Sequence, residues 1–207
     1  MTSVTTLFLA RHGETVWHEG NRYAGVSDIG LTDLGLRQAE ALGQWAGKAE
    51  LDAVWCSPLS RARSTAEPAA RSAGVDLQVD KGLIELDFGT AEGRTLAEVA
   101  VDAPEAVAAF EADPVAHPLP GEEDPRAAIR RGTAALWRIA SAHPGQRVLV
   151  VWHGTLMRLV LSELLGMPAG EYRRQLPEIR NGALTELRLT APEQVALLSF
   201  NSRVMPF

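Results

Sequence analysis

Residues 5–15 read Thr-Thr-Leu-Phe-Leu-Ala-Arg-His-Gly-Glu-Thr, and this stretch decides how the fold is interpreted. Residues 5–10 form a short apolar run, which predicts a buried strand. Arg11 and His12 follow the run directly, with Gly13 behind them. Ligands of open α/β sheets bind outside the carboxyl ends of the strands. The stretch therefore predicts a strand that ends at a binding site.

The rest of the chain alternates between apolar runs and helical patterns. Further strands are predicted at 53–56, 77–79 and 147–152, and a closing pair at 183–189 and 195–200 around Ala191 and Pro192. Helices are predicted from an N-cap at Thr32 to Ala46, and over 60–73, 96–111, 126–142 and 156–165. Pro68 is expected to kink or split its helix, and Pro104 to divide the next one. Such alternation predicts an α/β fold, with a mostly parallel sheet and helices on both faces.

Length and composition fit one globular domain. The chain has 207 residues, of which 46% are apolar and 22% charged, close to the soluble average. Disordered, collagen-like and coiled-coil chains are therefore excluded. We expect a single domain over residues 1–207, with a lid-like excursion over about 94–125 that includes the proline-rich stretch 113–125.

Charge and cysteine content narrow the setting and the partners. The net charge of −6 argues against binding of nucleic acid through a broad basic surface. A single cysteine, Cys56, excludes an internal disulfide, and no leader or membrane-spanning segment is visible. We expect a cytoplasmic protein with no membrane partner; a homodimer is compatible with the sequence. Of the 20 basic residues only Lys48 and Lys81 are lysines, and this Arg excess beside abundant Ala is typical of a GC-rich bacterial genome.

Charged side chains follow four predicted strands. Arg11 and His12 follow the first, Arg61 lies shortly after the second, Glu85 after the third and His153 after the fourth. Either His alone would more often be structural, and Arg61 alone would more often be a solvated helix charge. Their joint placement at one sheet edge predicts a cationic pocket, and arginines bind phosphoryl oxygens with paired donors.

This set of side chains has a defined chemistry. A His can attack phosphorus and form a covalent intermediate, while the other cations stabilise the transferring group. Glu85 is placed to protonate the leaving group and then to activate water. We expect no metal and no other cofactor, because arginines neutralise the charge and would repel a cation bound by His12, His153 and Glu85. The partner expected is a small phosphorylated substrate or inorganic phosphate.

The sequence resembles the histidine phosphatase superfamily, which includes cofactor-dependent phosphoglycerate mutases and many small phosphatases. Residues 11–15, RHGET, match its signature, and residues 17–32 follow its W-N-x-x-x-R-x-x-G-x-x-D-x-P-L-T stretch. Residues 57–67, 85–93 and 150–154 are similar to its S-P-L-x-R-A, E-x-x-F-G-x-W-E-G and V-V-S-H-G segments. The resemblance implies a three-layer α/β/α sandwich.

The resemblance also implies the roles of the residues. His12 would be the nucleophile, Glu85 the proton donor and base, and Arg11, Arg61 and His153 would hold the phosphoryl oxygens. We expect the substrate to be contacted by His18, Arg22, Tyr23, Ala24, Gly25, Gly154 and Thr155. The glycine after each His, Gly13 and Gly154, is expected to let a ligand approach the backbone.

His18 stands where the family usually has an Asn that donates to the phosphoryl group. Imidazole changes charge between about pH 5 and 8, so we expect a steeper pH dependence than usual. A plain space-filling role for His18 is equally open.

Three functions remain open, with a phosphatase preferred. Mutases of the family carry a Trp-Arg-Arg segment that holds a substrate carboxylate, and residues 94–125 contain neither Trp nor paired Arg. This favours a metal-independent phosphomonoester hydrolase that acts through phosphohistidine over a mutase. A non-catalytic phospho-ligand-binding regulator is the third alternative, although no catalytic position is missing. The pair Arg130-Arg131 is expected on a solvated helix face. The pair Arg173-Arg174 follows Gly170 in a predicted loop and could reach the site entrance, although a surface position is preferred.

Overall fold

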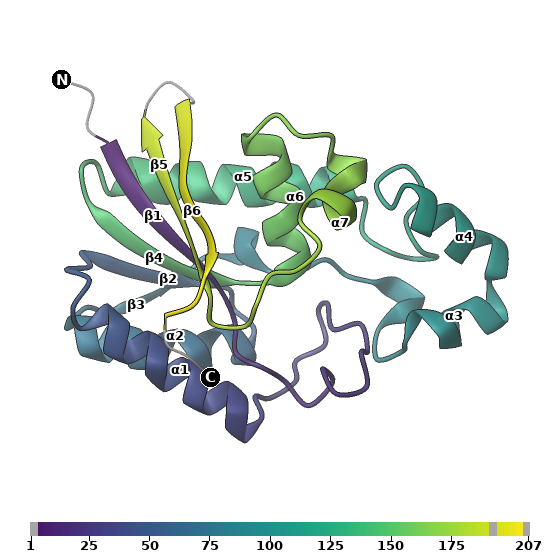
Figure 1. The fold of residues 1–207 in the computed structure, drawn as a ribbon, viewed down its shortest axis with the longest axis horizontal. Coiled ribbons are helices and arrows are strands. Elements are labelled where there is room, and N and C mark those ends of the chain that lie inside the picture. The colour runs from purple at the N-terminus through teal and green to yellow at the C-terminus, as the bar shows by residue number, and fades with distance from the viewer. Residues whose placement is uncertain (1–3, 191–193, 205–207) are drawn as a thin grey trace.

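A single six-stranded sheet organises the computed structural model, which describes residues 4–190 and 194–204 (Figure 1). The strands lie in the order β3-β2-β4-β1-β5-β6. Strands β1 to β4 are parallel, whereas β5 runs antiparallel to β1 and β6 antiparallel to β5. The mostly parallel α/β architecture predicted from the sequence is therefore confirmed. The strands are β1 Val4–Arg11, β2 Ala53–Cys56, β3 Leu77–Val79, β4 Arg147–Trp152, β5 Leu184–Thr190 and β6 Gln194–Ser202.

Helices cover both faces of the sheet. Side chains of a strand point alternately to its two sides. Phe8 and Ala10 of β1 pack in the apolar core beneath α1 and α2, whereas Leu7 and Leu9 pack in the core beneath α5 and α6. The helices are α1 Asp33–Ala46, α2 Ser60–Ala73, α3 Leu96–Asp102, α4 Pro104–Ala112, α5 Pro125–Ala142, α6 Gly154–Leu164 and α7 Tyr172–Gln175, with 3-10 turns at Lys81–Leu83, Gly89–Ala91 and Ala169–Glu171.

Most predicted boundaries are confirmed within a few residues. The strands at 53–56, 77–79 and 147–152 and the helix at 60–73 match the prediction fully. Thr32 caps α1 by accepting a hydrogen bond from the Gly35 N–H, and Pro104 begins α4 and so separates it from α3. The predicted turn at Ala191 and Pro192 lies outside the described residues.

The expected split of the helix at Pro68 is wrong, because α2 continues through it from Ser60 to Ala73, whereas a kink there stays a prediction. Pro68 is buried and packs against Gly43 of α1; a Cβ added at Gly43 would lie 2.9 Å from the Pro68 Cβ. A proline inside a helix removes one backbone hydrogen bond. Close packing of its ring between two helices offsets this loss.

The segment 94–125 lies beside the loop 12–31, beyond the carboxyl ends of the parallel strands (Figure 1). The Tyr23 ring is 6.5 Å from the Phe110 ring of α4, and Arg22 forms an ion pair with Glu98 of α3. Whether this segment moves as a lid stays a prediction. None of the helices in the described ranges is long and apolar enough to cross a membrane.

The contact between α1 and α2 gives a prediction for stability. In Gly43→Ala the new Cβ would meet Pro68 Cβ at 2.9 Å and the Pro68 backbone carbonyl at 3.1 Å. Overpacking of this kind costs about 1–3 kcal/mol and outweighs the helix preference of Ala. We therefore expect a lower midpoint of urea unfolding. Gly47→Ala is the control, because its nearest neighbour would be 3.6 Å away. A Gly43→Ala protein as stable as wild type would contradict this packing.

Candidate active site

The two histidines of the predicted site are neighbours in space. The parallel pairing of β1 and β4 sets Arg11 opposite Trp152, and the His12 N–H donates to the Trp152 carbonyl at 2.9 Å. The next residues along the two strands are His12 and His153, whose ring centroids are 5.2 Å apart. Both side chains are buried. The predicted meeting of these two residues at one sheet edge is confirmed.

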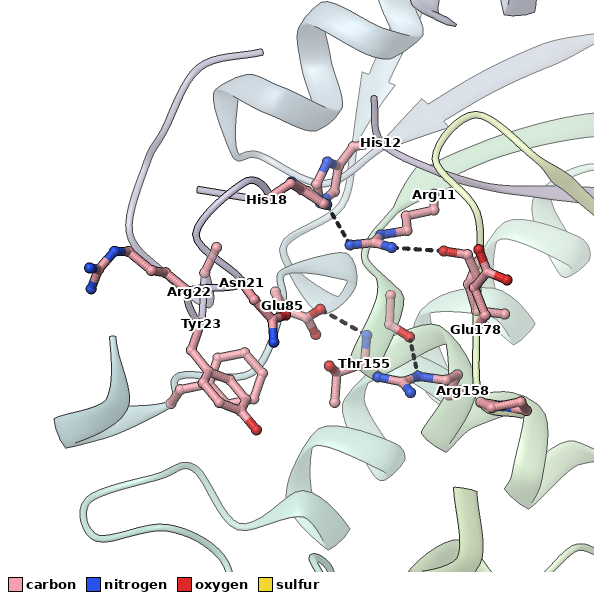
Figure 2. Close-up of a pocket in the computed structure, with 15 residues that line it drawn as sticks. Arg11, His12, His18, Asn21, Arg22, Tyr23, Glu85, Thr155, Arg158 and Glu178 are labelled. Atoms are coloured by element: carbon pink, nitrogen blue, oxygen red, sulfur yellow. Dashed lines mark hydrogen bonds between the residues drawn. The ribbon is translucent and has the colours of Figure 1, made fainter. Parts of the chain in front are cut away.

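A cavity of about 240 Å³ lies in front of His12 (Figure 2). Arg61, His153 and Gly25 are buried and are not among the residues that line it. The other predicted site residues line the cavity: Arg11, His12, His18, Arg22, Tyr23, Ala24, Glu85, Gly154 and Thr155. Six further residues that were not among the predicted site residues line it as well: Asn21, Phe88, Arg158, Pro177, Glu178 and Ile179.

His12 is held as a neutral ring with a defined proton position. Its Nδ1 lies 2.7 Å from the Gly13 carbonyl oxygen, which can only accept, so the ring proton is on Nδ1 and the lone pair on Nε2. Burial and the nearby charges of Arg11 and Arg61 keep the pKa of His12 well below its usual value. A neutral ring with a free Nε2 lone pair is the form of His that can act as a nucleophile.

Arg61 is fully buried and fixes the loop that follows the RHGET stretch. Its Nη atoms donate to the carbonyls of Ala24, Gly25 and Ser27 at 2.6–3.1 Å. A Cβ on Gly25 would lie 2.0 Å from the Leu86 carbonyl oxygen. Gly25 is therefore needed for packing, and its predicted contact with substrate is not seen in the cavity lining.

Three buried side-chain nitrogens near His12 have no hydrogen-bond partner among the described residues: Arg11 Nε, Arg61 Nε and His153 Nδ1. The Ser57 hydroxyl lies 2.7 Å from His153 Nε2, and in the tautomer in which this hydroxyl donates to Nε2, His153 Nδ1 carries the ring proton and is a donor. Burial and the charge of Arg61 hold the pKa of His153 well below its usual value. Buried donors without acceptors are costly, and an anion would satisfy them.

The Glu85 carboxylate is tied to the start of α6. Oε1 accepts from the backbone N–H groups of Leu86 and Leu156 at 3.0 and 2.8 Å, and Oε2 accepts from the Thr155 N–H at 2.9 Å (Figure 2). Two donors occupy Oε1, whereas Oε2 has one position free. Oε2 is therefore the oxygen that can carry a proton at the cavity.

The expectation that Arg130 and Arg131 both lie on a solvated face is wrong for Arg131. Arg131 is half-buried and donates to the carbonyls of Gly82 and Ile84 at 3.0 and 2.5 Å. It also reaches the Glu85 carbonyl at 3.2 Å and both Glu123 oxygens at 2.8 Å. Arg131 thereby uses all five donors of its guanidinium and fixes the backbone that carries Glu85.

His18 lies at the cavity wall with polar groups beside both ring nitrogens. Arg11 Nη2 and Asn181 Nδ2 are 2.6 and 3.3 Å from Nε2, and the Thr15 N–H and hydroxyl are 3.0 and 2.8 Å from Nδ1. Burial and the charge of Arg11 lower the pKa of His18 to about 4. The expectation that His18 changes charge between about pH 5 and 8 is therefore wrong for the free protein.

Arg22 and Tyr23 reach the cavity in different ways. The Arg22 guanidinium turns outward to Glu98 and the Gly93 carbonyl, so an ion pair satisfies it away from the cavity (Figure 2). The Tyr23 ring packs against Phe88 with ring centroids 4.8 Å apart. Its hydroxyl accepts from Arg173 Nη1 at 3.2 Å, so Arg173, although exposed, contacts a residue of the site and is not a plain surface charge.

Gly13 and Gly154 make room for the protein's own atoms. A Cβ on Gly13 would lie 2.6 Å from the Gly35 carbonyl oxygen of α1, and a Cβ on Gly154 would lie 3.1 Å from Arg11 Nε. The expectation that Gly13 serves the approach of a ligand is thus replaced by a packing role. Gly154 does line the cavity, next to Arg11.

Residues of the segment before β5 and of α6 were missed. Asn181 Nδ2 donates to the His12 carbonyl at 2.8 Å, and Glu178 lines the cavity. β5 is antiparallel to β1, so its start lies at the same edge as the end of β1. Arg158 follows Gly154 by one helical turn, so the two residues lie on the same face of α6. An Arg within an otherwise apolar helix could have identified Arg158 as a candidate site residue.

Among the side chains described, no group of three His, Cys, Asp or Glu residues is arranged to hold a metal ion. The predicted candidates His12, His153 and Glu85 share their surroundings with Arg11 and Arg61.

Two curated proteins with sequences similar to this chain have different names. A bifunctional protein of Mycobacterium tuberculosis is 36% identical over 198 residues, which cover 94% of this chain and 54% of that protein. The chain thus spans about half the length of this curated relative. A probable phosphoglycerate mutase of Yersinia pestis is 31% identical over 181 residues, which cover 87% of this chain and 83% of that protein.

A solved structure adds a phosphatase to these relatives. The mycobacterial glucosyl-3-phosphoglycerate phosphatase, determined with VO3, superposes with a TM-score of 0.85 at 27% identity, over 95% of this chain and 99% of that chain. The family model of the histidine phosphatase superfamily (branch 1) matches residues 7–202, and the chain therefore belongs to that superfamily.

Proposed function

We propose that this protein hydrolyses a phosphomonoester without a metal ion, through a phosphohistidine at His12. The observation that carries the proposal is the set of buried donors without partners, Arg11 Nε, Arg61 Nε and His153 Nδ1, near a neutral His12. The phosphoryl oxygens would accept from these donors. A phosphatase neighbour of similar fold supports hydrolysis.

His18 adds a further donor once an anion is present. In the free protein, Arg11 and the Thr15 N–H both point at the His18 ring, and a neutral imidazole can accept only one of them. A phosphoryl oxygen that accepts from Arg11 and from His18 Nε2–H leaves Nδ1 to accept from Thr15. His18 thus supplies the hydrogen bond that the family's usual Asn supplies.

The reaction has two steps, the transfer of the phosphoryl group to His12 and the hydrolysis of the phosphohistidine. His12 Nε2 attacks phosphorus, the ester P–O bond breaks, and the leaving oxygen takes the proton from Glu85 Oε2. Glu85 then takes a proton from water, whose oxygen attacks phosphorus. The P–N bond breaks, its electron pair returns to Nε2, and inorganic phosphate leaves.

A mutase is the second candidate, because a curated relative is named a probable phosphoglycerate mutase. Arg94, the single Arg of residues 94–125, bonds to the Glu98 carbonyl and Asp102 and does not line the cavity. This segment therefore offers no Arg to hold substrate, and hydrolysis is preferred.

Replacing His12 tests the nucleophile. We expect His12→Ala to lower the hydrolysis of p-nitrophenyl phosphate by at least roughly 1000-fold, because no covalent intermediate can form. Wild-type activity should persist in EDTA. His117→Ala is the matched control, since His117 is exposed in the segment after α4. No turnover by wild type on this substrate and a broad phosphate panel would exclude hydrolysis, and loss of activity with EDTA would exclude the metal-free route.

Glu85→Gln separates the two steps. Gln cannot exchange a proton, so kcat on an alkyl phosphate should fall about 10²–10⁴-fold. p-Nitrophenolate leaves without protonation, so the first step survives and phosphoprotein accumulates, visible as a burst of one p-nitrophenol per protein. The exposed Glu111→Gln of α4 should behave as wild type. An unchanged kcat of Glu85→Gln on alkyl phosphates would argue against its role as acid and base.

The pH profile tests the state of His18. With a pKa of about 4, His18 is neutral above about pH 5, so its loss of a proton lies below the usual working range. The value of kcat/KM reports the free protein. We expect wild type and His18→Asn to give parallel kcat/KM profiles from about pH 5 to 8. A steeper wild-type profile would show that His18 titrates in that range after all.

A further inference from the structure

Arg158 is a second cationic group of the cavity, separate from the phosphoryl-binding donors. It lies on α6 and lines the cavity near Thr155, on the side away from His12 (Figure 2). Its guanidinium carbon is 4.9 Å above the centre of the Tyr172 ring, and Nε donates to the Gly154 carbonyl at 3.2 Å. Stacking and this hydrogen bond hold the guanidinium in place.

The Nη atoms of Arg158 are left free for a ligand. Within residues 4–190 and 194–204, no protein acceptor bonds to them and no carboxylate lies within 4 Å of Arg158. Burial lowers the pKa of Arg158; Tyr172 and the Glu85 carboxylate, which lines the same cavity, act against this shift, and the like charge of Arg173 acts with it. A partly buried cation without a counter-ion is costly unless an anion binds it.

The phosphoryl group does not need this cation. Arg11, Arg61, His153 and His18 already supply its donors in the mechanism proposed above. Arg11 and Arg158 line the same cavity, and burial together with the like charge of Arg158 lowers the pKa of Arg11 to about 10. One free guanidinium balances one negative charge, and a cavity of about 240 Å³ admits only a small molecule.

We propose that the substrate is a small phosphomonoester that also carries a carboxylate, and that the Nη atoms of Arg158 bind this carboxylate. Guanidinium and carboxylate form paired hydrogen bonds. Tyr23 and Thr155 also line the cavity, and Arg173 Nη1 donates to the Tyr23 hydroxyl at 3.2 Å. This inference rests on the phosphatase activity proposed above and names its substrate class.

Matched substrates with and without a carboxylate test the proposal. The pairs are O-phosphoserine against O-phosphoethanolamine, and 3-phosphoglycerate against glycerol 3-phosphate. We expect wild type to prefer the carboxylate member of each pair by at least about tenfold in kcat/KM. In Arg158→Gln this ratio should fall about 10- to 100-fold, mainly through KM.

Arg174→Gln is the control variant. Arg174 is exposed, pairs with Glu171 at 2.6 Å and does not line the cavity, so the ratio should stay at the wild-type value. Thermal unfolding establishes that Arg158→Gln folds. If that variant is unfolded, Arg158→Lys replaces it; Lys keeps the charge but loses the paired geometry, and a smaller fall of the ratio is expected.

The outcomes separate this proposal from the phosphatase activity itself. Equal wild-type rates on both members of each pair, or an Arg158 variant that lowers both rates alike, would overturn the carboxylate subsite and leave the phosphatase activity standing. Wild-type turnover of none of the four substrates, nor of p-nitrophenyl phosphate, would instead count against the phosphatase activity.

Discussion

Residues 12 and 153 are neighbours because β1 and β4 pair in parallel, with Arg11 opposite Trp152. A shift of this register by one residue would turn the side chains of one strand to the opposite faces of the sheet. Leu7 and Leu9 of β1 pack in one apolar core and Phe8 packs in the other, on the opposite face of the sheet. This alternation fixes the register of β1 against β4. Core packing on both faces of the sheet thus sets the geometry of the site.

The site concentrates positive charge where the structure offers few carboxylates. Arg61 is buried and Arg11 partly buried, neither forms an ion pair with a described carboxylate, and burial lowers the pKa of each. The start of α6 could bind an anion through its N–H groups, yet Thr155 and Leu156 donate to Glu85 instead. The helix end therefore positions the proton carrier, and arginine and histidine donors are left for the phosphoryl group.

Much of this arrangement could be predicted from the sequence, because the rule that ligands bind beyond parallel strands needs only strand positions. Arg11, His12, Glu85 and His153 were found in this way. Asn181 was missed because the antiparallel direction of β5 is a property of the topology. The role of Arg131 could not be predicted either, because it donates to backbone carbonyls of residues 82–85. Every residue has a backbone carbonyl, so the amino-acid sequence does not indicate which carbonyls an arginine will bind.

The distribution of ion pairs explains how an acidic protein can hold a phosphate. Arginines such as Arg22, Arg131 and Arg138 each lie within 4 Å of a carboxylate, so they contribute little free positive charge. Arg11 and Arg158 have no such partner in the described part of the chain and both line the cavity. A carboxylate beside either would compete with an anionic ligand for the same donors. The net charge of −6 therefore coexists with a local cationic cavity, because two of its arginines, Arg11 and Arg158, have no carboxylate within 4 Å among the described residues.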